Sequence, residues 1–117
     1  MKILVVDNEP GIRRNIQRIL RDHEVVTASS AVDACKTMLD TTGFDLVLSN
    51  VGMSGGTGVD LHRWVVEHRP GLATRFAFMT GGMQNEVAEY IREAGSPILA
   101  KPFTIDEVKE VLAGFDF

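Results

Sequence analysis

Four short, strand-like apolar runs in this sequence each lead directly into a polar residue. These polar positions are Asp7 and Asn8 after residues 3–6, Asn50 after 44–49, Thr80 after 76–79, and Lys101 after 98–100. In an open parallel α/β sheet, the carboxyl ends of the strands share one edge, and ligands bind in the crevice there. We therefore expect these distant residues to converge on one acidic pocket that a threonine and a lysine flank.

The runs alternate with segments whose apolar residues recur at helical spacing, and a fifth strand-like run, 25–28, follows the first helical segment. Five strands that alternate with helices predict an α/β protein with a parallel sheet, right-handed crossovers and helices on both faces. Pro10 is expected in the first turn of one helix, Ser30 and Thr104 at the N-terminal ends of two others, and Gly95 at a helix C-terminus.

The helical segments also predict which side chains face the core. The expected core-facing residues are Ile12, Ile16, Ile19 and Leu20; Val32, Cys35, Met38 and Leu39; Leu61, Trp64, Val65 and His68; Val87, Tyr90, Ile91 and Ala94; and Ile105, Val108, Leu112 and Phe115. The third helix is expected to end at Pro70-Gly71. His23, His62 and His68 lack metal-ligand spacing and are expected to be structural or solvated.

Length and composition exclude several classes of protein. At 117 residues, with 44% hydrophobic and 24% charged residues, the chain fits one globular domain, 1–117. A net charge of −4 argues against nucleic acid as the main partner. The arginine-rich stretch 13–21 is more typical of a solvated helix face than of a docking surface.

The same reasoning bears on where the protein works. No run approaches the roughly 18 apolar residues of a membrane-spanning helix, and the N-terminal run is too short for a signal peptide. The single cysteine, Cys35, provides no disulfide framework and is expected to be a packing residue. We therefore expect a cytoplasmic protein with no membrane partner.

Over essentially its whole length the sequence resembles the receiver domain of two-component response regulators. The markers, in receiver order and spacing, are Val6-Asp7-Asn8-Glu9-Pro10, the run 44–50 with Met53 and Gly58, Thr80-Gly81, and Lys101-Pro102-Phe103. One such marker would be weak evidence, whereas the ordered set is strong. The resemblance implies a flavodoxin-like, doubly wound fold of five βα units with strand order 2-1-3-4-5. It also makes the bond before Pro102 a candidate cis peptide.

In receivers, an acidic pair after the first strand and an aspartate that ends the third strand hold Mg²⁺, a hard cation that prefers oxygen ligands. That aspartate accepts a phosphoryl group from a phosphohistidine, while a threonine hydroxyl and a lysine ammonium orient the phosphoryl oxygens. The resemblance places Asp7 and Asn8 at the acidic pair, Asn50 at the phosphoacceptor, Gly52 as a backbone metal ligand, Thr80 as the switch hydroxyl, and Lys101 as the phosphate-binding lysine.

The sequence departs from the receiver pattern at the centre of this site. Asn50 cannot form an acyl phosphate, because its amide oxygen is neutral and far less nucleophilic than a carboxylate. Asn8 removes a second negative charge, and Glu9 lies one position past the pair. Because site charge is a main determinant of affinity, Mg²⁺ binding is expected to be weak or absent here.

Two more departures lie beside the site. The stretch from Ser54 to Gly58 lacks the proline and the acidic residue that are frequent there in receivers, and its glycines predict a looser loop. Ile98 stands where receivers carry a switch aromatic, and the joint Gly95-Ser96-Pro97 looks short. Coupling between Thr80 and an aromatic residue is therefore not expected.

The first of three functions open to this sequence is a pseudo-receiver, which is not an enzyme and takes no phosphoryl group. It would act by contact of residues 85–115 with a histidine kinase, a histidine phosphotransfer protein or a fused effector, or it would form a homodimer through the same residues. Gly81-Gly82 and the short joint at Ser96-Pro97 resemble receivers that are fused to kinases, as in a hybrid histidine kinase.

Two other functions remain as alternatives. A competent receiver would use Ser49, Ser54 or Asp45 as its acceptor, although strand alternation turns Ser49 away from the side that Asn50 faces. A flavodoxin-like cofactor-binding protein is the third, but no flavin or nucleotide cradle is visible in the sequence.

Overall fold

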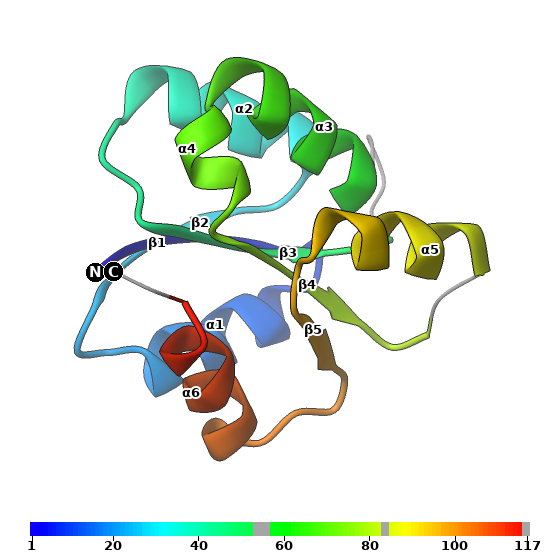
Figure 1. Ribbon diagram of the computed structural model, residues 1–117. Helices are drawn as coiled ribbons and strands as arrows, with labels where there is room; N and C mark the ends of the chain where they lie inside the picture. Colours follow the sequence, from blue (N-terminus) through cyan, green and yellow to red (C-terminus); the bar gives the residue numbers. More distant parts are fainter. Residues whose placement is uncertain (53–56, 83–84, 116–117) are drawn as a thin grey trace.

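The computed structural model describes residues 1–52, 57–82 and 85–115, and these residues form a sheet of five parallel strands with helices on both faces (Figure 1). The strand order is β2-β1-β3-β4-β5. The strands are β1 Lys2–Val6, β2 Glu24–Ala28, β3 Leu46–Asn50, β4 Phe76–Thr80 and β5 Ile98–Ala100. This architecture confirms the flavodoxin-like, doubly wound fold with order 2-1-3-4-5.

Two helical layers cover the sheet. The helices are α1 Pro10–Ile19, α2 Ala31–Asp40, α3 Gly58–His68, α4 Pro70–Ala73, α5 Asn85–Ala94 and α6 Ile105–Ala113. Figure 1 shows α2, α3, α4 and α5 on one face, and α1 with α6 on the other. In the part of the chain that the structure describes, no helix has the length and apolar character needed to cross a membrane.

Alternation along the strands divides the core between the two faces. In β1, Leu4 and Val6 pack toward α2 and α3, while Ile3 and Val5 pack toward α1 and α6. All four side chains are fully buried, as expected for a strand that is covered on both sides. The central strands therefore consist almost entirely of apolar residues, and polar residues enter only where these strands end.

The helix ends follow the local sequence signals. Pro10 opens α1, and Gly95, after α5, has the positive φ of 71° that favours glycine. Thr104 and Glu107 form a reciprocal capping box at the start of α6. At α2 the box is only partial: Ser30 accepts a hydrogen bond from the Asp33 backbone N–H, but the Asp33 carboxylate bonds to the residue before Ser30.

The structure corrects several element boundaries. β3 begins at Leu46 rather than at residue 44, and it includes Asn50. Pro70-Gly71 does end α3, as predicted, but the same residues start the short helix α4, because proline is well suited to the first turn of a helix.

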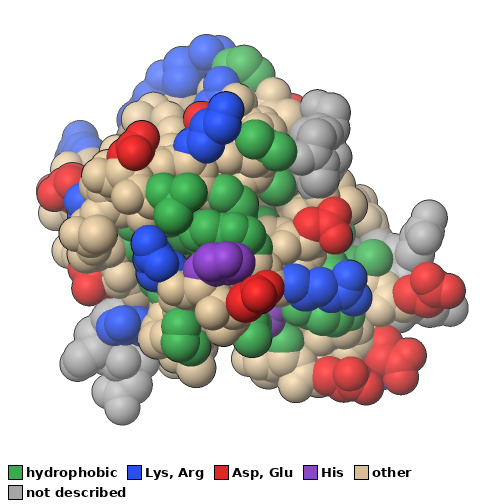
Figure 2. All heavy atoms as spheres, turned by 90° about the horizontal axis from the view of Figure 1, so that it is seen from above, with side chains coloured by type: hydrophobic (Ala, Val, Ile, Leu, Met, Phe, Trp, Pro, Cys, Tyr) green, Lys and Arg blue, Asp and Glu red, His purple; other side chains and the backbone are tan. Residues whose placement is uncertain are grey.

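The predicted core faces are wrong at five positions, where the side chains are exposed: Val32, Leu39, His68, Ala94 and Ile105. In α2 the buried residues are Ala31, Ala34 and Met38, so small alanines face the sheet and the larger apolar residues face outward. Figure 2, which looks onto the layer that contains α2 and α3, shows hydrophobic side chains exposed among charged ones. Cys35 packs against the core as predicted, and burial raises the pKa of its thiol.

His62, rather than His68, is the buried histidine of α3, and only 4% of it is exposed. Its Nδ1 lies 2.7 Å from the Tyr90 hydroxyl on α5, and its ring contacts Phe76 and Phe78 of β4. Burial lowers the pKa of His62, and a hydrogen bond to the Ala73 backbone offsets part of that shift. His62 is thus a structural link between α3 and α5, in keeping with the expectation of a structural role.

We expect His62 to make the fold sensitive to mild acid. The native state disfavours protonated His62, whereas the unfolded chain protonates it near pH 6.5, so below about that pH the unfolded state binds the additional proton. The free energy of unfolding should therefore fall as the pH drops from about 7.5 to about 5. Urea unfolding at several pH values in this range measures the free energy of unfolding. That free energy should fall more steeply with decreasing pH for the wild type than for His62→Gln. His68→Gln, the same change at an exposed position of α3, controls for the substitution itself. An equal pH dependence of stability for the wild type and His62→Gln would contradict the role given to buried His62.

Candidate functional site

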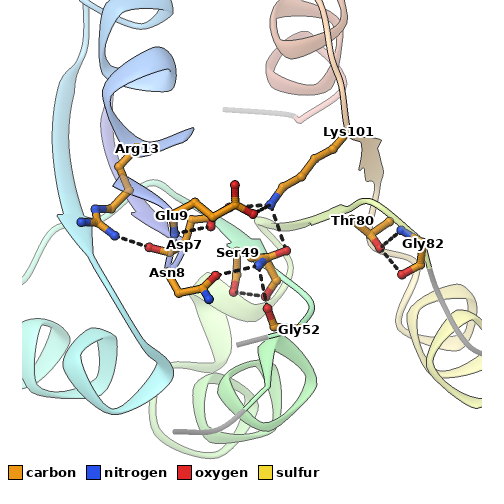
Figure 3. A network of polar contacts seen from close by, with 10 residues as sticks. Asp7, Asn8, Glu9, Arg13, Ser49, Gly52, Thr80, Gly82 and Lys101 are labelled. Carbon is orange, nitrogen blue, oxygen red and sulfur yellow. Dashed lines mark hydrogen bonds and ion pairs between the residues drawn. The ribbon is translucent and has the colours of Figure 1, made fainter. Parts of the chain in front are cut away.

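The carboxyl edge of the sheet brings the predicted polar residues together. β1, β3, β4 and β5 all end there, and Asp7, Asn8, Asn50 and Lys101 form one connected set of hydrogen bonds (Figure 3). Thr80 lies at the same edge but bonds to its own loop. The peptide bond that follows Lys101 is cis, in agreement with the resemblance.

The Asp7 carboxylate and the Lys101 ammonium form the charged centre of this edge. Asp7 is fully buried, and its Oδ2 lies 2.8 Å from Lys101 Nζ. Its Oδ1 accepts a hydrogen bond of 2.9 Å from the Glu9 backbone N–H. The Glu9 carboxylate is largely exposed and lies 3.8 Å from the same ammonium. Because an isolated buried carboxylate is very costly, Lys101 is the group that makes Asp7 tolerable inside the protein.

Asn50 is held by hydrogen bonds at both ends of its amide. Its Nδ2 donates to the Gly52 carbonyl at 2.7 Å and, more weakly, to Asn8 Oδ1 at 3.4 Å, while its Oδ1 accepts from Lys101 Nζ at 3.2 Å. The reversed orientation would place two oxygens against each other at Gly52 and an NH₂ group against the ammonium. The surroundings therefore fix which way this amide points.

Thr80 ends β4 and closes the turn that follows. Its hydroxyl donates to the Gly82 carbonyl at 2.7 Å and accepts from the Gly82 N–H at 3.0 Å. Its backbone carbonyl accepts from the Lys101 N–H at 2.7 Å, so the two residues are joined through the main chain. Figure 3 shows the Thr80 and Gly82 pair set apart from the network around Asp7 and Lys101.

Gly58 fixes the distance between the end of β3 and the start of α3. A Cβ at this position would overlap the Asn50 backbone oxygen and would lie 3.2 Å from Ser49 Oγ. The Gly58 N–H also donates to the Val51 carbonyl at 2.8 Å. Only a residue without a side chain permits this approach, which places the α3 N-terminus directly beside Asn50.

Arg13 takes part in the site, although its place in the sequence predicts only a solvated role. Its guanidinium reaches back from α1 and donates to the Asp7 backbone oxygen at 2.5 Å. The signal that was available is its position one helical turn after Pro10, on the segment that leads directly away from β1. The predicted residues Met53, Ser54, Gly55 and Gly56 lie outside the described residues, and Ile98, at the expected switch position, is 42% exposed.

Sequence comparison identifies the family. Residues 3–113 match the model of the response regulator receiver domain. The chain is 31% identical to the chemotaxis protein CheY of Pseudomonas aeruginosa over 117 aligned positions, and the match covers 94% of this chain and 91% of that protein. It is 27% identical to the response regulator protein PilR of the same organism, where the match covers 96% of this chain but only 25% of PilR.

Solved structures give the same result. The chemotaxis protein CheY4 of Vibrio cholerae superposes with a TM-score of 0.85 at 26% identity, over 96% of this chain and 95% of that one. The response regulator TrrA of Thermotoga maritima, in complex with Mg²⁺-BeF, has a TM-score of 0.83 at 25% identity, over 96% of both chains. The chain therefore belongs to the response regulator receiver domain family. It is a CheY-like receiver of the kind found in two-component systems.

Receivers bind Mg²⁺, but the side chains of this edge do not fit that ion. Among the described residues, no three or more histidine, cysteine, aspartate or glutamate side chains form a group that could hold a metal. The oxygens that face the edge are already used: Asp7 bonds to Lys101, and the Gly52 carbonyl and Asn8 Oδ1 accept from the Asn50 amide. Mg²⁺ keeps several water ligands but is usually held by one or two carboxylates. Here the Asp7 carboxylate is paired with Lys101, and the Glu9 carboxylate is largely exposed and lies 3.8 Å from the same ammonium.

Gly58→Ala should destabilise the protein. The added Cβ overlaps the Asn50 backbone oxygen, so strand and helix must separate, at a cost of about 1–3 kcal/mol in the free energy of unfolding. Gly11→Ala is the matched control, because a Cβ at that position meets no atom within 4 Å and alanine favours α1. Chemical denaturation measures both variants, and equal stability of the two would show that the close approach does not constrain the fold.

Lys101→Met should destabilise the protein by about 3 kcal/mol, because it leaves the Asp7 carboxylate buried without a counter-charge. Adding Asp7→Asn should restore part of that loss, since no buried charge then remains. The control Lys109→Met removes an exposed lysine from α6 and should change stability by no more than about 0.5 kcal/mol. Additive effects in the double variant, measured by urea unfolding, would refute the pairing.

Proposed function

We propose that this chain is a receiver that works by protein–protein contact and does not accept a phosphoryl group. The observation that carries the proposal is the Asn50 amide at the end of β3, where receivers place their phosphoacceptor aspartate. Acceptance requires an anionic carboxylate oxygen that attacks phosphorus. The Asn50 oxygen is neutral, and it already accepts a hydrogen bond from Lys101.

In this proposal the other residues keep their receiver positions and change what they do. Lys101 corresponds to the phosphate-binding lysine, but it serves as the counter-charge of Asp7. Thr80 corresponds to the switch hydroxyl, but it closes a turn with Gly82. Asp7, Asn8, Asn50 and Gly52 correspond to the metal ligands. With no acceptor carboxylate, the chain is not an enzyme that promotes its own phosphorylation.

Two of the three alternative acceptors, Asp45 and Ser49, are poorly placed, which supports the same proposal. Asp45 precedes β3, at the opposite end of the strand from Asn50, and its carboxylate accepts from the Lys2 backbone N–H at 2.8 Å. Ser49 is fully buried, and its hydroxyl donates to the Asn50 backbone oxygen. Ser54, the third alternative, lies outside the described residues.

The proposed docking surface is the stretch 85–115, which contains α5, β5 and α6. Its exposed charged side chains include Glu86, Glu89, Arg92, Glu93, Lys109 and Glu110. We propose a histidine kinase, a histidine phosphotransfer protein or a fused effector as the partner, or a second copy of the chain. The match to a quarter of PilR supports fusion, because it shows a related receiver within a longer protein.

The proposal predicts that the protein gains no phosphoryl mass when it is incubated with acetyl phosphate and Mg²⁺. Asn50→Asp should restore acceptance: a carboxylate oxygen attacks phosphorus, the bond to acetate breaks, and an aspartyl phosphate forms. The yield should be low while Asn8 remains and higher in the double variant with Asn8→Asp, because the added carboxylate strengthens the metal site.

Intact-mass spectrometry under native and base-treated conditions measures the modification. Asn15→Asp, which places the same change at an exposed position of α1, controls for non-specific labelling. Stoichiometric, base-labile labelling of the wild type would overturn the proposal. An unlabelled double variant under saturating donor would show that the surroundings of residue 50, and not only its side chain, have lost the activity.

A further inference from the structure

The Asn50 amide forms hydrogen bonds to two oxygens that receivers would offer to a metal. Its Nδ2 bridges the Gly52 carbonyl, in the segment after β3, and Asn8 Oδ1, after β1. These are two of the oxygens that the proposed function assigns to the metal site. Taking that assignment as its basis, we propose that the Asn50 NH₂ group replaces the divalent cation as the link between these segments, so that the site is complete without a metal.

The hydrogen-bonding capacity of the amide matches this role. An NH₂ group has two donors, and here two carbonyl oxygens accept from it. The Oδ1 atom faces the Lys101 ammonium, which can only donate. In the described residues, no buried side-chain nitrogen or oxygen lacks a hydrogen-bond partner. The buried carboxylate and amide oxygens of Asp7 and Asn50 therefore already have partners, and a cation would not provide a missing interaction for them.

Charge leads to the same inference. The Asp7 carboxylate is compensated by Lys101 at 2.8 Å, so the buried part of the site is close to neutral. Glu9 provides a further carboxylate in the network, but it is largely exposed and lies 3.8 Å from the ammonium. A dication would add two positive charges beside Lys101 and would receive little compensation.

Cation entry would also require the Asn50 amide to turn over. Only the reversed amide would turn an oxygen of Asn50 toward the Gly52 carbonyl and Asn8, the two groups that would be its fellow ligands. Its NH₂ group would then face the Lys101 ammonium, and the bonds to Gly52, Asn8 and Lys101 would all be lost. Loss of buried hydrogen bonds without replacement is unfavourable, so the metal-free arrangement is the stable one.

Thermal unfolding of the whole chain, in EDTA and in millimolar MgCl₂ at matched ionic strength, tests this inference. The wild type should have the same Tm in both solutions. Asn50→Asp should unfold at a Tm lower by about 5 °C or more in EDTA, because it loses two donors and adds a charge beside Asp7. In Mg²⁺ this variant should recover part of the loss, because the substitution adds a carboxylate to the metal site although Asn8 remains. Asn15→Asp, at an exposed position, should show neither effect.

A saturable rise in the wild-type Tm with Mg²⁺ would overturn the inference. An Asn50→Asp variant whose Tm does not rise in Mg²⁺ would also overturn it. If that variant does not fold in EDTA, recovery of its circular dichroism on adding Mg²⁺ supports the inference, while failure to recover counts against it. The proposed function fails separately: a wild type that Mg²⁺ stabilises but that still takes no phosphoryl group leaves the contact-only proposal intact.

Discussion

The carboxyl edge of this receiver depends on the ion pair between Asp7 and Lys101. The two residues follow strands that are not neighbours, because β3 and β4 separate β1 from β5. Lys101 therefore extends over the end of β3, and its ammonium donates both to the buried Asp7 carboxylate and to Asn50 Oδ1. Once this charge is placed, the orientation of Asn50 is determined, and with it the bonds to Asn8 and Gly52.

The fold was predictable from sequence because its signals are local and repeated. Apolar runs with helical segments between them specify a parallel sheet, and Thr104, Pro10 and Gly95 mark helix ends by simple backbone chemistry. The outward face of α2 was not predictable in the same way. Large residues such as Leu39 dominate the apolar periodicity, whereas the alanines that pack on the sheet contribute little to it.

The sequence predicts which residues lie at the site but not which contacts they make there. Shared placement at strand ends brings Asp7, Asn50 and Lys101 to one edge whatever their side chains do. The turn of Thr80 onto Gly82, by contrast, depends on loop geometry that no spacing rule contains. Arg13 was missed for a similar reason: its contact is with a backbone oxygen, and every residue offers one.

The approach of Gly58 to the Asn50 carbonyl has a consequence for how such a domain can change over time. The side chain at position 50 can be exchanged without moving the main chain, because it points into the polar edge. The glycine at position 58 cannot be exchanged in this way, because any Cβ there would meet the Asn50 main chain rather than a movable side chain. The proposed loss of phosphoryl acceptance would therefore leave the glycine at position 58 in place, because this glycine serves main-chain packing and not the phosphoryl chemistry.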